Sequence, residues 1–206
     1  MVHLRKRTFL RSRKQLRLFV FGTSLSAERT ILPWRQCGGD WVYLLREHAR
    51  TCQHELSVIN GSRWGANSGW ALRHFRDRAL LHAPTLIVFE FAINDADIRN
   101  SISVAESENN LHRMIYLARQ IDGECAIWLM TSHVPAGRHK TVRPALNDYY
   151  AMYRSLARQS NLGLIDLHQR WGATPPDDRY LTDGIHTNAL AAQEVILPFV
   201  LSQLKL

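Results

Sequence analysis

Short apolar runs alternate with longer amphipathic stretches along this chain from Gln15 onward. The short runs are mostly β-branched and aliphatic, which is typical of strands that are buried on both faces. They cover residues 16–21, 56–59, 86–91, 126–130 and 163–167. The longer stretches carry apolar residues at helical spacing and therefore predict helices. These stretches cover residues 41–49, 70–81, 104–121, 145–157 and 189–204.

This alternation predicts an α/β fold, a three-layer α/β/α sandwich built on a five-stranded parallel sheet. The chain has 206 residues, of which 46% are hydrophobic, so it is long enough for one substantial core. Because no change in composition divides it, we expect a single domain over residues 15–206, preceded by a basic arm over residues 1–14. In an open parallel sheet the ligand site lies beyond the carboxyl ends of the strands, and we expect the chemistry there.

The formal net charge of +8 comes largely from the basic arm. A solvated arm and an arm attracted to an acidic polymer both fit this charge. The apolar run that follows is too short for the core of a secretory signal, and cleavage after Ala27 would remove Ser24. No stretch is apolar for long enough to span a membrane. We therefore expect a cytoplasmic protein.

Three cysteines, Cys37, Cys52 and Cys125, show neither a disulfide framework nor a paired metal-ligand spacing. A reducing compartment fits this usage best, although a bridge between Cys37 and Cys52 remains open if the protein is exported. The histidines in the helical stretches lack partners at ligand spacing, so we expect no metal and no other cofactor.

Two segments carry the residue types of nucleophilic catalysis. Gly22-Thr23-Ser24 follows the first apolar strand, and Asp183-Gly184-Ile185-His186 lies just before the last helix. A serine hydroxyl becomes a good nucleophile when an imidazole takes its proton and a carboxylate fixes the orientation of that imidazole. Asp183 and His186 can meet within one turn, so the fold has to bring only Ser24 to them. Taken singly, Ser24 also suits a helix cap, and His186 suits a surface position.

Two further segments complete a resemblance to the SGNH (GDSL-type) hydrolases, a family of serine esterases and lipases with a flavodoxin-like fold. Residues 60–65, which end in Gly65, follow the second strand, and Ala92-Ile93-Asn94-Asp95 follows the third. The four segments occur in the family order and span almost the whole chain after the basic arm. The resemblance implies that Ser24 is the nucleophile and that Asp183 and His186 complete a catalytic triad.

Attack on an ester carbonyl develops a negative oxygen, which needs hydrogen-bond donors that are already in place. The resemblance implies that three groups form this oxyanion hole: the backbone amides of Ser24 and Gly65 and the side-chain amide of Asn94. Gly61 is a rival to Gly65 for the glycine position. We also expect Ser24 to lie at the amino end of a helix, whose dipole favours negative charge.

Two positions depart from the family pattern. Thr23 stands where the family usually has Asp, and Ala92 stands where it usually has Gly. We expect Thr23 to leave the loops around the site less ordered, because it removes a carboxylate, and Ala92 to narrow the floor of the pocket.

Residues near the rim suggest how a substrate is held. We expect Trp64 to offer a flat stacking surface and Asp95 to contact substrate, with Trp34 and Trp70 as further candidates. Packing in the core is the alternative for each tryptophan. The basic segment 133–140 should overhang the pocket as a mobile flap, and its charge suggests an anionic substrate unless it is an ordinary solvated loop.

These features predict a serine esterase that removes short acyl groups, with acetyl groups on carbohydrates as the favoured substrate class. The sequence lacks an apolar lid that would suit long acyl chains. Two alternatives remain: an O-acyltransferase that uses the same triad, and a non-catalytic module that binds polyanions on the same fold. We expect a small-molecule or carbohydrate ester as partner and no nucleic acid, and the sequence leaves the oligomeric state open.

Overall fold

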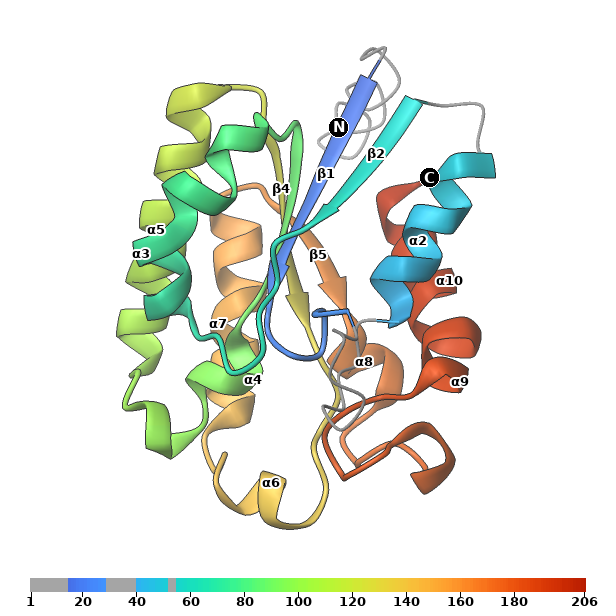
Figure 1. The fold of residues 1–206 in the computed structure, drawn as a ribbon. Coiled ribbons are helices and arrows are strands. Elements are labelled where there is room, and N and C mark those ends of the chain that lie inside the picture. Colours follow the sequence, from blue (N-terminus) through green and yellow to red (C-terminus); the bar gives the residue numbers. More distant parts are fainter. Residues whose placement is uncertain (1–14, 29–39, 52–54) are drawn as a thin grey trace.

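A single parallel sheet forms the centre of the molecule. The structure is a computed structural model that describes residues 15–28, 40–51 and 55–206. In this part of the chain five strands pair in the order β2-β1-β3-β4-β5 (Figure 1), which is the order of flavodoxin-like sheets. The strands are β1 (Gln15–Gly22), β2 (Glu55–Asn60), β3 (Leu86–Glu90), β4 (Ala126–Thr131) and β5 (Gly163–Asp166). The predicted α/β fold and its five strands are therefore confirmed.

Helices cover both faces of the sheet, as the sequence predicted (Figure 1). One face carries α3 (Ser68–Arg78), α5 (Val104–Ile121) and α7 (Leu146–Gln159). The other carries α2 (Asp40–Thr51) and α10 (Leu197–Leu204). Strand β3 contributes to both layers because alternate side chains of a strand point to opposite faces. Ile87 and Phe89 belong to the core under the first group of helices, while Leu86 and Val88 belong to the core under the second.

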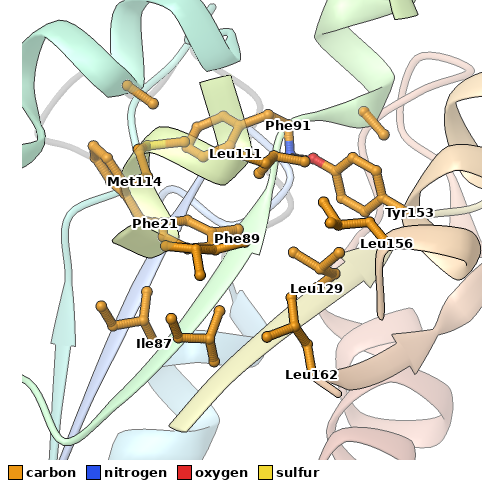
Figure 2. Packing of buried hydrophobic residues seen from close by; sticks show 14 of the residues in the cluster. Phe21, Ile87, Phe89, Phe91, Leu111, Met114, Leu129, Tyr153, Leu156 and Leu162 are labelled. Atoms are coloured by element: carbon orange, nitrogen blue, oxygen red, sulfur yellow. Dashed lines mark hydrogen bonds between the residues drawn. The ribbon is translucent and has the colours of Figure 1, made fainter. Parts of the chain in front are cut away.

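Aromatic side chains fill the larger core next to the carboxyl ends of the central strands. Figure 2 shows Phe21, Phe89 and Phe91 in one cluster with Leu111 and Met114, which lie on α5. The rings of Phe21 and Phe91 meet edge to face with centroids 5.4 Å apart. The hydroxyl of Tyr153 accepts a hydrogen bond of 3.2 Å from the amide of Phe91. This packing fixes the end of β3, from which the next polar segment departs.

The last helix covers the expected residues 189–204, but it is not a regular α-helix throughout. It consists of α9 (Ala189–Ala191), a π-helical turn (Ala192–Ile196) and α10. Pro198 stands at the start of α10 and has no amide hydrogen to donate. The amide of Leu197 instead reaches back to the carbonyl of Ala192, which gives the wider π-type turn.

Two other element boundaries differ from expectation. The helix expected over 70–81 ends at Arg78 and is followed by a 3₁₀ turn (Leu80–His82) and by Ala83 in the left-handed region, just before Pro84. The fifth strand ends at Asp166, because Leu167 already opens the short helix α8 (Leu167–Trp171). Asp166 caps that helix by accepting a hydrogen bond from the amide of Gln169.

Several sequence-based expectations concern residues outside the described part of the chain. These are the basic arm over residues 1–14, the stacking role of Trp34, and the pairing of Cys37 with Cys52. Cys125 is described: it is buried, and its Sγ donates to the carbonyl oxygen of Pro84 at 3.4 Å. Of the helices that the structure describes, none is long and apolar enough to cross a membrane.

Candidate active site

The four polar segments singled out in the sequence converge at the carboxyl end of the sheet. Because β1 lies between β2 and β3, the loops that leave these three strands are neighbours. The amide of Arg63, after β2, donates to the carbonyl of Gly22 at the end of β1, at 3.0 Å. The turn that carries Asp183 and His186 is distant in the sequence but also lies at this end of the sheet, next to Ser24.

Ser24, His186 and Asp183 form a continuous line of hydrogen bonds. The Oγ of Ser24 lies 2.9 Å from Nε2 of His186, and Nδ1 of His186 lies 2.7 Å from Oδ2 of Asp183. Ser24 and His186 are 8% and 7% exposed, so most of this line is shielded from water. With Nδ1 bonded to a carboxylate, Nε2 is the ring nitrogen that faces the serine hydroxyl. This is the arrangement in which imidazole removes a proton from serine.

The turn from Asp183 to His186 is organised by the carboxylate itself. Its Oδ1 accepts hydrogen bonds from the amides of Ile185 and His186, at 3.1 and 2.8 Å, so only Oδ2 is left for the imidazole. A bridge between Leu181 and Thr187 closes the base of the turn. Burial opposes ionisation of Asp183, but the hydrogen bonds from His186 and Ile185 outweigh it and lower the pKa of the carboxyl group. Asp183 is therefore a fixed anion beside the ring.

Ser24 lies in a tight turn after β1. The amide of Ala27 donates to the carbonyl of Thr23 at 2.9 Å, which closes one helical turn around the serine. The next described helix, α2, begins at Asp40, so the expectation that Ser24 starts a regular helix is wrong for the described residues. Trp41 of α2 stabilises the turn, since its indole nitrogen donates to the carbonyl of Leu25 at 3.2 Å.

Glu90, the last residue of β3, is a site residue that sequence reasoning missed. Its Oε2 accepts three hydrogen bonds from the turn around Ser24: from the amide of Thr23 at 3.0 Å, from the hydroxyl of Thr23 at 2.8 Å and from the hydroxyl of Ser26 at 3.1 Å. The side chain is 1% exposed. A carboxylate therefore does bind this loop, and the expectation that Thr23 leaves it less ordered is corrected.

The environment of Glu90 disfavours its charge. Burial raises the pKa of Glu90 to about 7, against the opposing effect of hydrogen bonds from Thr23 and Ser26. Within the described part of the chain, no arginine or lysine forms an ion pair with it. The signal in the sequence was a glutamate at the end of an otherwise apolar strand, where alternation calls for a core side chain.

The structure separates the two candidate glycines after β2. Gly65 has φ +70°, a conformation that side chains disfavour, and a Cβ there would meet nothing within 4 Å. The space beside its Cα is therefore open. Gly61 instead packs directly under the ring of Phe19, which a Cβ would meet at 2.1 Å. Gly61 is required for packing, and Gly65 is the better match to a site residue.

Asn94 joins the third segment to the second. It lies in the short helix α4 (Ala92–Asp95) and is 8% exposed. Its side-chain Nδ2 donates to the carbonyl of Ala66 at 2.8 Å, next to Gly65. A primary amide carries two hydrogens, so this bond leaves one for another acceptor.

The neighbours of Asn94 do not have the roles expected from the sequence. Asp95 is 1% exposed, and its two oxygens accept from the amide of Ser68 and the hydroxyl of Ser107, which ties α3 to α5. The expectation that Asp95 contacts substrate is therefore wrong, because its carboxylate binds groups inside the protein. Burial raises its pKa to about 6. Ala92 is 1% exposed within the large core and does not form the floor of a pocket.

The two described rim tryptophans differ. The indole of Trp64 is nearly parallel to the imidazole of His186, with ring centroids 5.9 Å apart and an interplanar angle of 13°. It is 47% exposed, so it covers the histidine and still presents surface to solvent. Trp70 instead packs against the large core beside Phe21, as expected for the core alternative.

The basic segment 133–140 is anchored to the site at several points. His133 is buried, and burial lowers its pKa to about 4. The amide of Ala136 donates to the carbonyl of Gly184, between Asp183 and His186, at 2.7 Å. Beyond the segment, the buried Arg143 donates to the carbonyls of Ile93 at 2.6 Å and His139 at 2.9 Å. These bonds tie the expected flap, which includes the start of α6 (Gly137–Thr141), to the turn of Asp183 and His186 and to α4.

Comparisons with known proteins concern the family and the fold. The model of the GDSL-like Lipase/Acylhydrolase family matches residues 20–193. An arylesterase from Vibrio mimicus is 28% identical over 188 residues, which cover 91% of this chain and 88% of the relative. A lipase/acylhydrolase from Enterococcus faecalis has a similar structure, with a TM-score of 0.76, 24% identity and coverage of 93% of this chain and 96% of that one. An acetylxylan esterase from Geobacillus stearothermophilus gives a TM-score of 0.75 with 14% identity, covering 92% and 94%.

Proposed function

We propose that this chain, which belongs to the GDSL-like lipase/acylhydrolase family and is a carboxylic ester hydrolase, cleaves short acyl esters through an acyl-enzyme on Ser24. The observation that carries the proposal is the line of hydrogen bonds from Ser24 through His186 to Asp183, at 2.9 and 2.7 Å. The acyl-enzyme, the short acyl group and the residue roles are the proposed parts.

In the first half of the reaction, Oγ of Ser24 attacks the ester carbonyl carbon while Nε2 of His186 takes the hydroxyl proton. Asp183 stabilises the imidazolium that forms. The negative oxygen of the tetrahedral intermediate is held by the amides of Ser24 and Gly65 and by the free hydrogen on Nδ2 of Asn94. When the intermediate collapses, the leaving alcohol takes the proton from Nε2, and the acyl group remains on Ser24.

In the second half, a water molecule repeats this sequence on the acyl-enzyme. His186 takes a proton from the water, the hydroxide attacks the acyl carbon, and Ser24 recovers its proton as the carboxylic acid leaves. A sugar hydroxyl in place of water would give acyl transfer by the same steps.

A short acyl group, with acetyl on carbohydrate as the favoured class, fits the surroundings of the triad. Trp64 is the large exposed apolar side chain that stacks on His186, and a half-exposed indole suits a sugar or aryl ring. Leu81 and Ile121, two other exposed apolar side chains, precede β3 and β4 and so lie at the amino ends of these strands, away from the triad. Similarity in fold to acetylxylan esterases supports the same choice.

A fluorophosphonate probe and a series of p-nitrophenyl esters test this proposal. We expect the probe to label Ser24, and turnover to decrease from acetate to octanoate esters. Ser24→Ala should abolish labelling, and Ser24→Ala and His186→Ala should each reduce turnover by at least about 10⁴-fold. Ser202→Ala, on the surface of α10, is the matched control and should behave as wild type. Unchanged turnover in Ser24→Ala would refute the assignment.

Acetylated xylo-oligosaccharides test the substrate class. Release of free acetate that requires Ser24 would support carbohydrate deacetylation, whereas acetate found mainly on an added sugar acceptor would indicate a transferase. Cleavage of p-nitrophenyl acetate without any action on acetylated sugars would remove carbohydrate from the proposal and leave the esterase chemistry intact.

A further inference from the structure

We infer that Glu90 is a positioning residue for ester cleavage, whose buried carboxylate holds the turn on both sides of Ser24 and so fixes the hydroxyl and amide that act on the substrate. This inference rests on the proposed role of Ser24 as nucleophile. Glu90 does not face the substrate, because it is 1% exposed and binds through Thr23 and Ser26.

The three contacts bracket the nucleophile. Thr23 immediately precedes Ser24 and is held at both its amide and its hydroxyl, while Ser26 is held at its hydroxyl two residues later. The hydroxyl of Thr23 also accepts from the amide of Leu25 at 3.2 Å, so the order imposed by Glu90 continues past the serine. The amide of Ser24 lies between these fixed points, and its direction decides whether it can serve as an oxyanion donor.

The backbone is shaped to bring the carboxylate this close. Gly22 pairs with Glu90 in the parallel register of β1 and β3, and the amide of Thr23 donates to the carbonyl of Glu90 at 3.1 Å. A Cβ on Gly22 would lie 2.8 Å from Oε2 of Glu90 and 3.0 Å from its carbonyl oxygen. Glycine at this position is thus explained by room for the carboxylate.

The donor set indicates which form of Glu90 holds the turn. Three donors on one oxygen match an ionised carboxylate, which is a better acceptor than the protonated acid. The titratable groups that act on Glu90 from the elements around it are Asp95 on α4 and the phenols of Tyr150 and Tyr153 on α7. None of these groups is a cation, so none of them stabilises the negative charge of Glu90 at every pH. With its pKa raised to about 7, Glu90 gains a proton as the pH falls below neutrality, and the hold on the turn weakens.

Steady-state kinetics of four variants test the inference. In Glu90→Gln we expect kcat to fall by about 10- to 100-fold with KM little changed, because a small misplacement of reacting groups has an effect of that size. Thr23→Val should lower kcat in the same way, and Thr23→Ser, which keeps the hydroxyl, should restore it. Asp166→Asn is the matched control, since it removes a buried carboxylate at the end of β5 that also binds a threonine hydroxyl but does not touch the turn.

The pH profile gives a second measurement that a purely structural role would not change. In the wild type, protonation of Glu90 should contribute to the fall of log(kcat/KM) on the acid side and steepen its slope. In Glu90→Gln this contribution should be lost, so the slope should become shallower. If Glu90→Gln fails to fold, the comparison of Thr23→Val with Thr23→Ser decides the question.

The outcomes separate the two proposals. If wild type is labelled at Ser24 while Glu90→Gln and Thr23→Val keep wild-type kcat and slope, the role of Glu90 is refuted and the esterase assignment stands. If wild type is not labelled and Ser24→Ala has no effect on turnover, both proposals are refuted together.

Discussion

Two buried carboxylates at strand ends, Glu90 on β3 and Asp166 on β5, are built alike and behave differently. Each accepts a hydrogen bond of 2.8 Å from a threonine hydroxyl, from Thr23 or Thr131. Asp166 also meets Arg154 at two points, 2.7 and 3.0 Å, while Glu90 has hydroxyl and amide donors only. Burial opposes the negative charge of both carboxylates. The hydrogen bonds from Arg154 and Thr131 outweigh burial at Asp166 and lower its pKa, whereas burial dominates at Glu90 and raises its pKa to about 7. A cation makes a buried carboxylate a permanent anion; neutral donors leave it able to titrate.

Asp166→Asn is expected to have the largest effect on stability. It breaks a two-point pairing and leaves Arg154 without its partner, which should lower the free energy of unfolding by about 2 to 3 kcal/mol, less than for a fully buried pair because Arg154 keeps some exposure. Thermal unfolding followed by circular dichroism measures the change, with the exposed Asp77→Asn as control. A melting temperature equal to wild type would show that the pair contributes nothing.

Glu90→Gln should instead change how stability depends on pH. The pKa of Glu90 is raised from 4.5 to about 7 by folding, so its protonated form stabilises the protein below pH 4.5, and this contribution is lost as the pH rises to 7. In that window the free energy of unfolding of the wild type should decrease with pH, and replacing Glu90 with Gln should reduce this slope by up to about 1.4 kcal/mol per pH unit. Denaturant unfolding at pH 5, 6, 7 and 8 tests this. Parallel curves for variant and wild type would contradict the raised pKa.

Gly22→Ala, beside Glu90, should lower activity, whereas Gly163→Ala, on the strand of Asp166, should lower stability. Alanine at Gly22 meets the carboxylate and the backbone of Glu90, so the nucleophile turn must shift and kcat should fall by about 10- to 50-fold. Alanine at Gly163, on the strand that ends in Asp166, meets the ring of Trp128 at 1.9 Å and should lower stability without changing kcat of the folded enzyme. Active-site titration with the fluorophosphonate probe corrects for unfolded protein. Equal losses of kcat in both variants would contradict this division.

Trp64→Ala should have the smallest effect, because Trp64 lies outside both carboxylate networks. Loss of a half-exposed stacking surface should raise KM for aryl and sugar esters by about threefold to tenfold, and Trp64→Phe should retain most of the affinity. Michaelis–Menten kinetics with p-nitrophenyl acetate and acetylated xylobiose measure this. An unchanged KM for both substrates would limit Trp64 to covering His186.

The sequence predicted the sheet and the contact of Ser24, His186 and Asp183 because both leave local signals. Apolar runs of strand length mark β1 to β5, and Asp183 and His186 occupy one turn whose hydrogen bonds are internal to it. Ser24 was found because it directly follows a strand, where a parallel sheet gathers its loops.

What the sequence did not reveal depends on contacts between distant residues. Asp95 resembles an exposed site residue in the sequence, but the fold turns it towards Ser68 and Ser107. The fit of Glu90 to Thr23 depends on which strand lies beside β1, and no local pattern encodes that neighbour. The π-helical turn before α10 precedes Pro198, and helical spacing alone predicted the helix but not this turn within it.

Ser24 and His186 are 162 positions apart in the sequence, and this separation also matters during synthesis. A ribosome adds Ser24 long before His186, so for most of synthesis a growing polypeptide carries this serine without that imidazole. With the roles proposed above, a product that ends before residue 183 would lack the base for Ser24. Ester hydrolysis would then begin only once residues 183–186 have been translated and have folded onto the turn around Ser24.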